Sequence, residues 1–161
     1  MDQDSLKKRF TKGTLPPILD GFYKGKLLLL LPVTFPEQLA EQLRHFYVPW
    51  VGKCFYPTKH SGDNILPQMT RTLLRIYPRK IIVGGQQFGG FHAFPFATSI
   101  TKGLGESVKV LQLNYDLPEN PPGIRDIIDE IVVIKENLLL GKVYLKEKDR
   151  FRLLGFFQLE K

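Results

Sequence analysis

The chain has 161 residues, of which 43% are hydrophobic, and it carries a formal net charge of +7 at pH 7. This length fits one domain, and the hydrophobic share excludes a globally disordered chain. The single cysteine, Cys54, excludes an internal disulfide framework, and the polar residues 1–11 lack the apolar stretch of a secretion signal. We therefore predict a single cytoplasmic domain.

Part of the positive charge lies near the start of the chain, in Lys7, Lys8, Arg9 and Lys12. Basic residues attract acidic membrane surfaces, so a peripheral adaptor is one functional alternative. A solubilising tail is the simpler interpretation, because the chain has no block of five or more basic residues. Aromatic residues interleaved with basic ones are also missing, so we predict no specific nucleic-acid partner.

Residues 1–19 form a charged lead-in segment in this interpretation, and residues 20–161 form a single β-barrel domain. The first strand is predicted from Asp20 to Leu31. Its five leucines favour a helix, but Gly25 and Pro32 would each be costly within one. A glycine in the middle of a strand marks a bend or a close backbone approach, as at a barrel corner.

Two helices are predicted near residues 36–47 and 65–77, where apolar side chains recur at helical spacing. They are inserted after the first strand and after a second strand at 50–56, and we expect one or both to cap an end of the barrel. From residue 81 onward the pattern is β throughout. The strands predicted there cover 91–101, 106–116, 127–134, 138–146 and 151–159.

The segment Gly21-Phe22-Tyr23-Lys24-Gly25 resembles the G-x-W-x-G signature of a bacterial family named for that motif, with Tyr23 in place of the tryptophan. The segment from Pro49 to Phe55 is similar to its second signature, a Trp followed by Gly-Lys-x-Phe. The last third, with Leu140-Gly141 and Phe156-Phe157, is similar to the family's C-terminal module of unknown function. The resemblance implies a lipocalin-like or calycin-like antiparallel barrel of about eight strands and little chemistry. We therefore expect a mainly β fold with two inserted or capping helices.

Aromatic residues are concentrated between Phe88 and Phe96, next to the glycine-rich residues 84–90. At strand spacing His92, Phe94 and Phe96 lie on one face, which gives an apolar wall with one polar group, as in many ligand pockets. Ordinary barrel core is an equally good interpretation, because a barrel of about eight strands either is filled by side chains or holds one small ligand.

The favoured function is non-enzymatic binding of a small hydrophobic or amphipathic ligand, of fatty-acid, isoprenoid or polyketide type, inside the barrel. The predicted ligand-binding residues are five pocket walls and one of two cations for an acidic head group: Tyr23, Trp50, His92, Phe94 and Phe96, with Lys53 or Arg125. The oligomeric state stays open.

An enzyme of isomerase or cyclase type on the same barrel is the other alternative. It would use Asp126 or Glu130 with His92, because paired carboxylates that face a lumen can act as acid and base. For the acidic group Asp126, Asp129 and Glu130 we favour a solvated, salt-bridged rim, so no catalytic residue is assigned.

No cofactor or metal site is predicted. The three histidines are His45, His60 and His92, whereas a haem barrel of nitrobindin type is expected to take its proximal histidine from late strands. Cys54 is predicted to be a small core residue. Three strands contain a Gly-Lys step, and we expect these lysines to point to water: Gly25-Lys26, Gly52-Lys53 and Gly141-Lys142.

Overall fold

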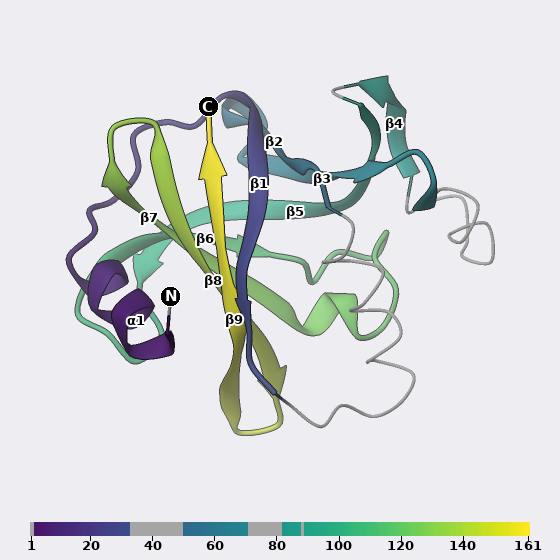
Figure 1. Ribbon diagram of the computed structural model, residues 1–161. Coiled ribbons are helices and arrows are strands. Elements are labelled where there is room, and N and C mark those ends of the chain that lie inside the picture. Colours follow the sequence, from purple (N-terminus) through teal and green to yellow (C-terminus); the bar gives the residue numbers. More distant parts are fainter. Residues whose placement is uncertain (1, 33–49, 71–81, 88) are drawn as a thin grey trace.

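The computed structural model describes residues 2–32, 50–70, 82–87 and 89–161 (Figure 1). These residues form one α-helix, α1, and nine strands, with short 3-10 turns η1 (Pro57–Lys59) and η4 (Ile124–Asp126). The remaining bounds are α1 Gln3–Thr11, β1 Gly21–Leu30, β2 Gly52–Tyr56, β3 Ser61–Pro67, β4 Ile82–Gln87, β5 Gly90–Lys102, β6 Lys109–Asn114, β7 Ile127–Lys135, β8 Leu138–Glu147 and β9 Arg150–Glu160.

Eight of the described strands close into an antiparallel barrel, which confirms the predicted fold class. The strand order is β3-β2-β1-β9-β8-β7-β6-β5, and β3 pairs with β5 to close the ring. The first and last strands of the barrel, β1 and β9, lie side by side (Figure 1). The ninth strand, β4, pairs with the early part of β5 outside this ring.

β1 begins within one residue of the predicted start. Glycine is needed at its two motif positions for different physical reasons. Gly21 adopts a φ of +73°, a conformation that favours glycine. Gly25 has no such need, but the ring of Trp50 lies where a Cβ atom would be. The predicted close approach at Gly25 is therefore a contact with this tryptophan.

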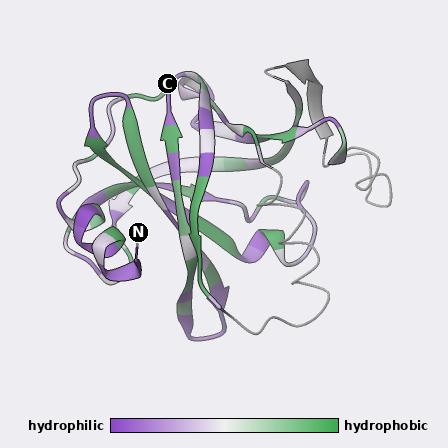
Figure 2. Ribbon diagram, in the orientation of Figure 1, coloured by the Kyte–Doolittle hydropathy of each residue, from purple (hydrophilic) through white to green (hydrophobic). Residues whose placement is uncertain are grey.

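Hydrophilic and hydrophobic residues are interspersed along the strands (Figure 2), and the buried apolar side chains form two clusters. The lumen cluster lies inside the barrel and includes Tyr23, Phe55, Leu66, Phe91, Ala93, Phe94, Phe96, Leu113, Tyr115, Ile127, Ile131, Val143, Phe157 and Leu159. The outer cluster joins α1 to the outside of the sheet through Leu6, Phe10, Val110, Val132, Leu140 and Phe156.

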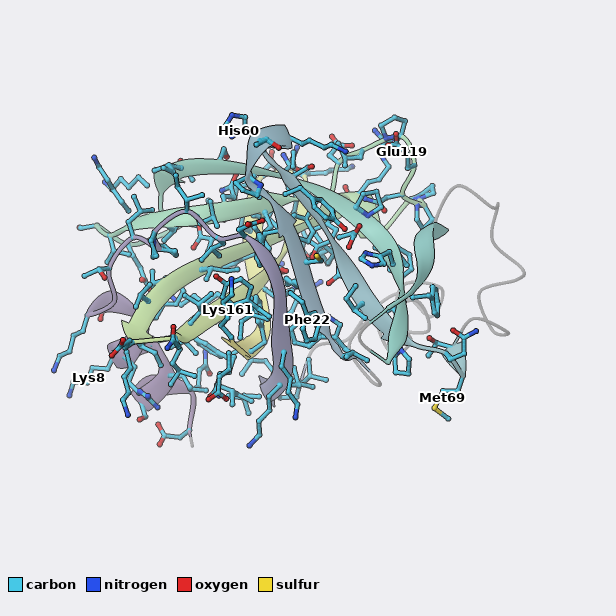
Figure 3. The ribbon with its side chains drawn as sticks, turned by 90° about the horizontal axis from the view of Figure 1, so that it is seen from above. Lys8, Phe22, His60, Met69, Glu119 and Lys161 are labelled. Carbon is cyan, nitrogen blue, oxygen red and sulfur yellow. The ribbon has the colours of Figure 1, made fainter. Side chains whose placement is uncertain are left out.

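The predicted lead-in at residues 1–19 contains a packed helix that the sequence did not indicate. α1 is capped by Asp2, whose side chain accepts a hydrogen bond of 2.9 Å from the backbone N–H of Ser5. Leu6 and Phe10 are fully buried against the barrel, whereas Lys8 projects from the helix into solvent (Figure 3). Within the described residues no helix is long and apolar enough to cross a membrane.

The outcome differs for the two helices predicted from the sequence. The helix near residues 36–47 lies outside the described residues. The helix near 65–77 is wrong at its start, because Ile65 and Leu66 belong to β3, where they pair with β5 opposite His92 and Phe91. Beyond residue 70 that prediction also lies outside the described residues.

Candidate functional site

A charged network lies in the barrel lumen and is centred on Lys53. β2 places this lysine between Tyr23 on β1 and Asn64 on β3, with its side chain pointing inward and fully buried. The Nζ atom is 2.9 Å from the Oδ2 atom of Asp129 on β7. It also donates hydrogen bonds to the Oδ1 atom of Asn64, at 2.8 Å, and to the hydroxyl oxygen of Tyr115, at 2.6 Å.

The lumen network, Lys53, Asn64, Tyr115 and Asp129, is held by further hydrogen bonds. The Tyr115 hydroxyl donates to the Oδ2 atom of Asp129 at 3.1 Å, and the Asn64 Nδ2 atom donates to the Phe94 carbonyl at 3.0 Å. Burial lowers the pKa of the Lys53 ammonium, and the nearby Asp129 carboxylate opposes that shift. Burial also raises the pKa of the Tyr115 hydroxyl well above its ordinary value. Such a buried ion pair is costly unless its hydrogen bonds are complete.

Aromatic rings surround the Lys53 ammonium. The ring centroids of Trp50, Phe96, Tyr115 and Phe157 lie 5.2, 5.4, 5.3 and 5.2 Å from Nζ. These distances allow cation–π attraction, which strengthens when water is excluded. Three of the rings are fully buried, and Trp50 is the half-buried member of the set.

An apolar cleft of about 370 Å³ lies at the end of the barrel where β1 begins. We call it the end cleft. Ile18 and Ile100 line it and are 84% and 63% exposed. Its other lining residues come from the segment before β1, from β2, β3 and the connection between them, and from β5 and β6: Pro16, Pro17, Leu19, Phe55, Pro57, His60, Ser61, Thr98, Ser99 and Leu111.

The floor of the end cleft is continuous with the lumen cluster. The Phe55 ring packs edge-on against Tyr23, with centroids 5.5 Å apart, and against Phe96 at 5.6 Å. His60, which adopts a φ of +47°, lies in the β2–β3 connection at the edge of the molecule (Figure 3). Among the residues that line the cleft, those with polar side chains are His60, Ser61, Thr98 and Ser99.

His92 lies on the outer face of the barrel, so the expectation that it shares a face with Phe96 is wrong. Its Nδ1 atom is 2.7 Å from the Oδ1 atom of Asp63 and 3.1 Å from the Tyr56 hydroxyl. The reason is Phe94, whose φ of +52° interrupts the strand where the β3–β5 register shifts and thereby resets the alternation of side chains. Burial raises the pKa of Asp63, and the bond with His92 opposes this.

The acidic group at the start of β7 does not form a solvated rim. Asp126 is exposed in η4, Asp129 points into the lumen and Glu130 is buried on the outer face. Adjacent strand residues face opposite ways, which separates the last two. Glu130 lies opposite Gln112, which pairs with Ser99, and Ser99 is seven residues from His92 along β5. Seven residues span about 23 Å of strand, so the structure does not bring Glu130 and His92 to one cavity.

Glu130 is enclosed beneath the β5–β6 connection. Its Oε1 atom accepts a hydrogen bond of 2.7 Å from the Leu104 N–H, and its buried Oε2 atom has no hydrogen-bond partner among the described residues. Burial raises the pKa of Glu130 to about 7, and the Lys142 ammonium opposes that rise. Lys142 is buried and ion-paired with Glu106.

The structure places the other predicted ligand residues in two regions. Tyr23, Phe94 and Phe96 are buried in the lumen cluster, and Trp50 packs beside it. Arg125 is 46% exposed and ion-paired with Asp116 at 2.6 Å on the surface. None of these side chains lines the end cleft.

Three partners of Lys53 were not predicted as site residues: Asn64, Tyr115 and Asp129. Strand alternation is the sequence signal that could have indicated an inward-pointing Lys53, because it places Lys53 and Phe55 on the same face of β2. The expectation that lysines of the Gly-Lys steps point to water is wrong for Lys53 and Lys142, which are buried, and right for Lys26.

Among the described residues, no three His, Cys, Asp or Glu side chains form a group that could hold a metal ion. Cys54 is buried, as predicted.

Comparisons with known proteins identify the class of fold. No family model matches the chain, and no curated protein matches it. A solved structure described as a protein from Thermomonospora curvata matches with a TM-score of 0.55 and 12% sequence identity, over 100% of this chain and 88% of that one. At this identity the match shows the fold alone, which is a closed antiparallel β-barrel.

Proposed function

We propose that the protein binds a small apolar or amphipathic molecule, of fatty-acid, isoprenoid or polyketide type, in the end cleft. One observation carries the proposal: an apolar cleft of about 370 Å³ at the mouth of a closed barrel. Ligand sites typically measure about 300–1,000 Å³, are mainly apolar with a few polar groups, and occur in the mouths of β-barrels. The resemblance to the G-x-W-x-G family, which implies a lipocalin-like barrel, supports the same role.

The lining of the cleft defines the chemistry of its ligand. The described residues around it include no Asp, Glu, Lys or Arg. The polar side chains among the lining residues are one imidazole and three hydroxyls, none of which carries a fixed charge, so we expect the bound part of the ligand to be uncharged. Lys53 and Arg125, the cations predicted for an acidic head group, do not line the cleft, and an acidic group would therefore extend into water.

Burial of two exposed isoleucines supplies the driving force for ligand binding in the end cleft. Burying an isoleucine side chain fully contributes about 1.5–3 kcal/mol. Covering the exposed parts of Ile18 and Ile100 therefore contributes roughly 3 kcal/mol, which is about 100-fold in affinity.

The test is direct ligand detection followed by binding to variants. Native mass spectrometry of gently purified protein, compared with its denatured mass, would reveal a carried molecule. A fluorescent fatty-acid analogue then gives affinities for the wild type and for Ile100→Glu, which places a charge in the cleft wall. The matched control is Met69→Glu, because Met69 is 73% exposed and does not line the cleft (Figure 3).

We expect at least tenfold weaker binding for Ile100→Glu and wild-type affinity for Met69→Glu. Ile100→Ala, which shortens the cleft wall without adding charge, is expected to weaken binding as well. Equal affinities for all four proteins would refute the end cleft as the ligand site.

A further inference from the structure

Lys53 is an amine held away from water. Its Nζ atom is fully buried among four aromatic rings, where the charged ammonium loses its hydration. Asp129 is its ionic partner at 2.9 Å. Transfer of one proton across this contact leaves a neutral amine beside a neutral carboxylic acid, and a low-dielectric environment favours neutral groups over separated charges. Lysines desolvated in this way can act as nucleophiles at neutral pH.

The groups that contact Lys53 can accept and donate the protons that such a reaction moves. The Tyr115 hydroxyl is 2.6 Å from Nζ and 3.1 Å from the Asp129 Oδ2 atom, so it connects the amine to the carboxyl group. Because burial raises its pKa, this hydroxyl stays protonated and can donate to a developing alkoxide. Asn64 orients the amine, since its Oδ1 atom accepts from Nζ while its Nδ2 atom is tied to the Phe94 carbonyl.

Trp50 adds an unsatisfied donor next to the amine. Its ring lies over Lys53 and is the half-buried wall of the aromatic enclosure. Within the part of the chain that the structure describes, the Trp50 Nε1 atom is buried and has no acceptor. Leaving a buried N–H unpaired costs about 1–3 kcal/mol, and a ligand oxygen would remove that cost.

We propose that Lys53 is a reactive amine that forms an imine with a small apolar aldehyde or ketone in the barrel lumen. Asp129 first takes a proton from the ammonium. The neutral Nζ atom then attacks the carbonyl carbon, the new C–N bond forms, and the electron pair of the C=O π bond moves to oxygen. Tyr115 protonates that oxygen and recovers a proton from the new ammonium, which gives a neutral carbinolamine.

Loss of water completes the step. Asp129 returns its proton to the carbinolamine hydroxyl, the C–O bond breaks and water leaves. The product is a protonated imine on Lys53 beside the Asp129 carboxylate. Ammonium, carboxylate and carbonyl compound have become iminium, carboxylate and water, with no oxidant or reductant. This reaction is independent of ligand binding in the end cleft, because it uses different side chains.

Pentane-2,4-dione is the probe for this amine. It condenses with a neutral amine, loses water and tautomerises to a conjugated enaminone that absorbs in the near ultraviolet, so no reducing agent is needed. The wild-type chain is treated at pH 7 under native conditions, and the modified lysines are mapped by peptide mass spectrometry. Lys142 is the internal control, because it is equally buried but paired with Glu106 and covered by the Phe10 ring.

We expect Lys53 to react at least tenfold faster than the exposed lysines and Lys142 to stay unmodified. Labelling confined to exposed lysines, or labelling of Lys53 only in denaturant, would overturn the proposal. Tyr115→Phe keeps the ring and removes the hydroxyl, so it should slow labelling of Lys53 at least tenfold and change its pH profile while circular dichroism stays native. An unchanged rate and profile would remove Tyr115 from the mechanism. Ile100→Glu, which weakens binding in the end cleft, should leave Lys53 labelling unchanged, so the two proposals can be refuted independently.

Discussion

Replacing Glu130 by glutamine tests how burial of a single carboxyl group changes its pKa and, through it, the stability of the protein. The groups that face it are the Leu104 N–H, the Lys142 ammonium, the Glu106 carboxylate and the Tyr144 hydroxyl. Its pKa is raised from 4.5 to about 7 in the folded protein, so the folded state holds this proton more tightly than the unfolded chain does. The stability associated with the protonated form is therefore complete below pH 4.5 and is lost as the pH rises to about 7.

The size of that loss follows from the shift in pKa. A rise from 4.5 to about 7 corresponds to at most about 3 kcal/mol of unfolding free energy, since each unit is worth about 1.4 kcal/mol. Glu130→Gln keeps the shape, can accept from Leu104, and cannot ionise. We expect the unfolding free energy of the variant, relative to that of the wild type, to rise by up to about 3 kcal/mol as the pH increases from 4 to 8.

Urea unfolding of both proteins at a series of pH values measures this difference. The comparison cancels the contributions of other titrating groups, because they are common to both proteins. Glu119→Gln is the control, since Glu119 is exposed in the loop before η4 (Figure 3). Parallel pH profiles for wild type and Glu130→Gln would refute the reasoning about burial of this carboxyl group.

Three further predictions concern stability. Lys53→Met should cost about 3–5 kcal/mol in urea unfolding, because it removes the ammonium that neutralises the buried Asp129 carboxylate, and adding Asp129→Leu should recover most of that loss; an additive double variant would contradict this. Gly25→Ala should cost about 1–3 kcal/mol in thermal unfolding, because its Cβ meets the Trp50 ring, and a Trp50→Leu background should reduce that cost. Asp2→Ala removes the cap of α1 and should lower its stability by about 1 kcal/mol, which amide hydrogen exchange of the helix would detect; unchanged protection would contradict the role of the cap.

Local patterns in the sequence predicted most of the strands. The hairpin expected at 127–134 and 138–146 is the β7–β8 pair almost residue for residue, because two largely apolar runs flank a short polar turn. The same reasoning failed at α1, where Leu6 and Phe10 are the only large apolar side chains in the helix. It also failed at β3, where apolar side chains at Ile65 and Leu66 were assigned to a helix that the pairing with β5 excludes.

The candidate sites depend on features that no local pattern contains. Lys53 and Asp129 are far apart in the chain, and only closure of the barrel brings them to 2.9 Å. Spacing in the sequence indicated one face for His92 and Phe96, but the positive φ of Phe94 separates them. The lumen was predicted as an aromatic space with a cation, and what could not be predicted was which carboxylate would neutralise that cation.

Two packed aromatic rings separate the end cleft from the lumen network. Phe55 lines the cleft, its ring is 5.6 Å from that of Phe96, and Phe96 lies 5.4 Å from the Lys53 Nζ atom. Both rings are buried in the close-packed core of the barrel, which leaves little freedom for either to move independently. A ligand in the cleft therefore rests against the outer ring, and an imine on Lys53 would rest against the inner one. Shortening Phe55 would join the two spaces, which makes this residue the position where binding in the cleft and chemistry at Lys53 would become coupled.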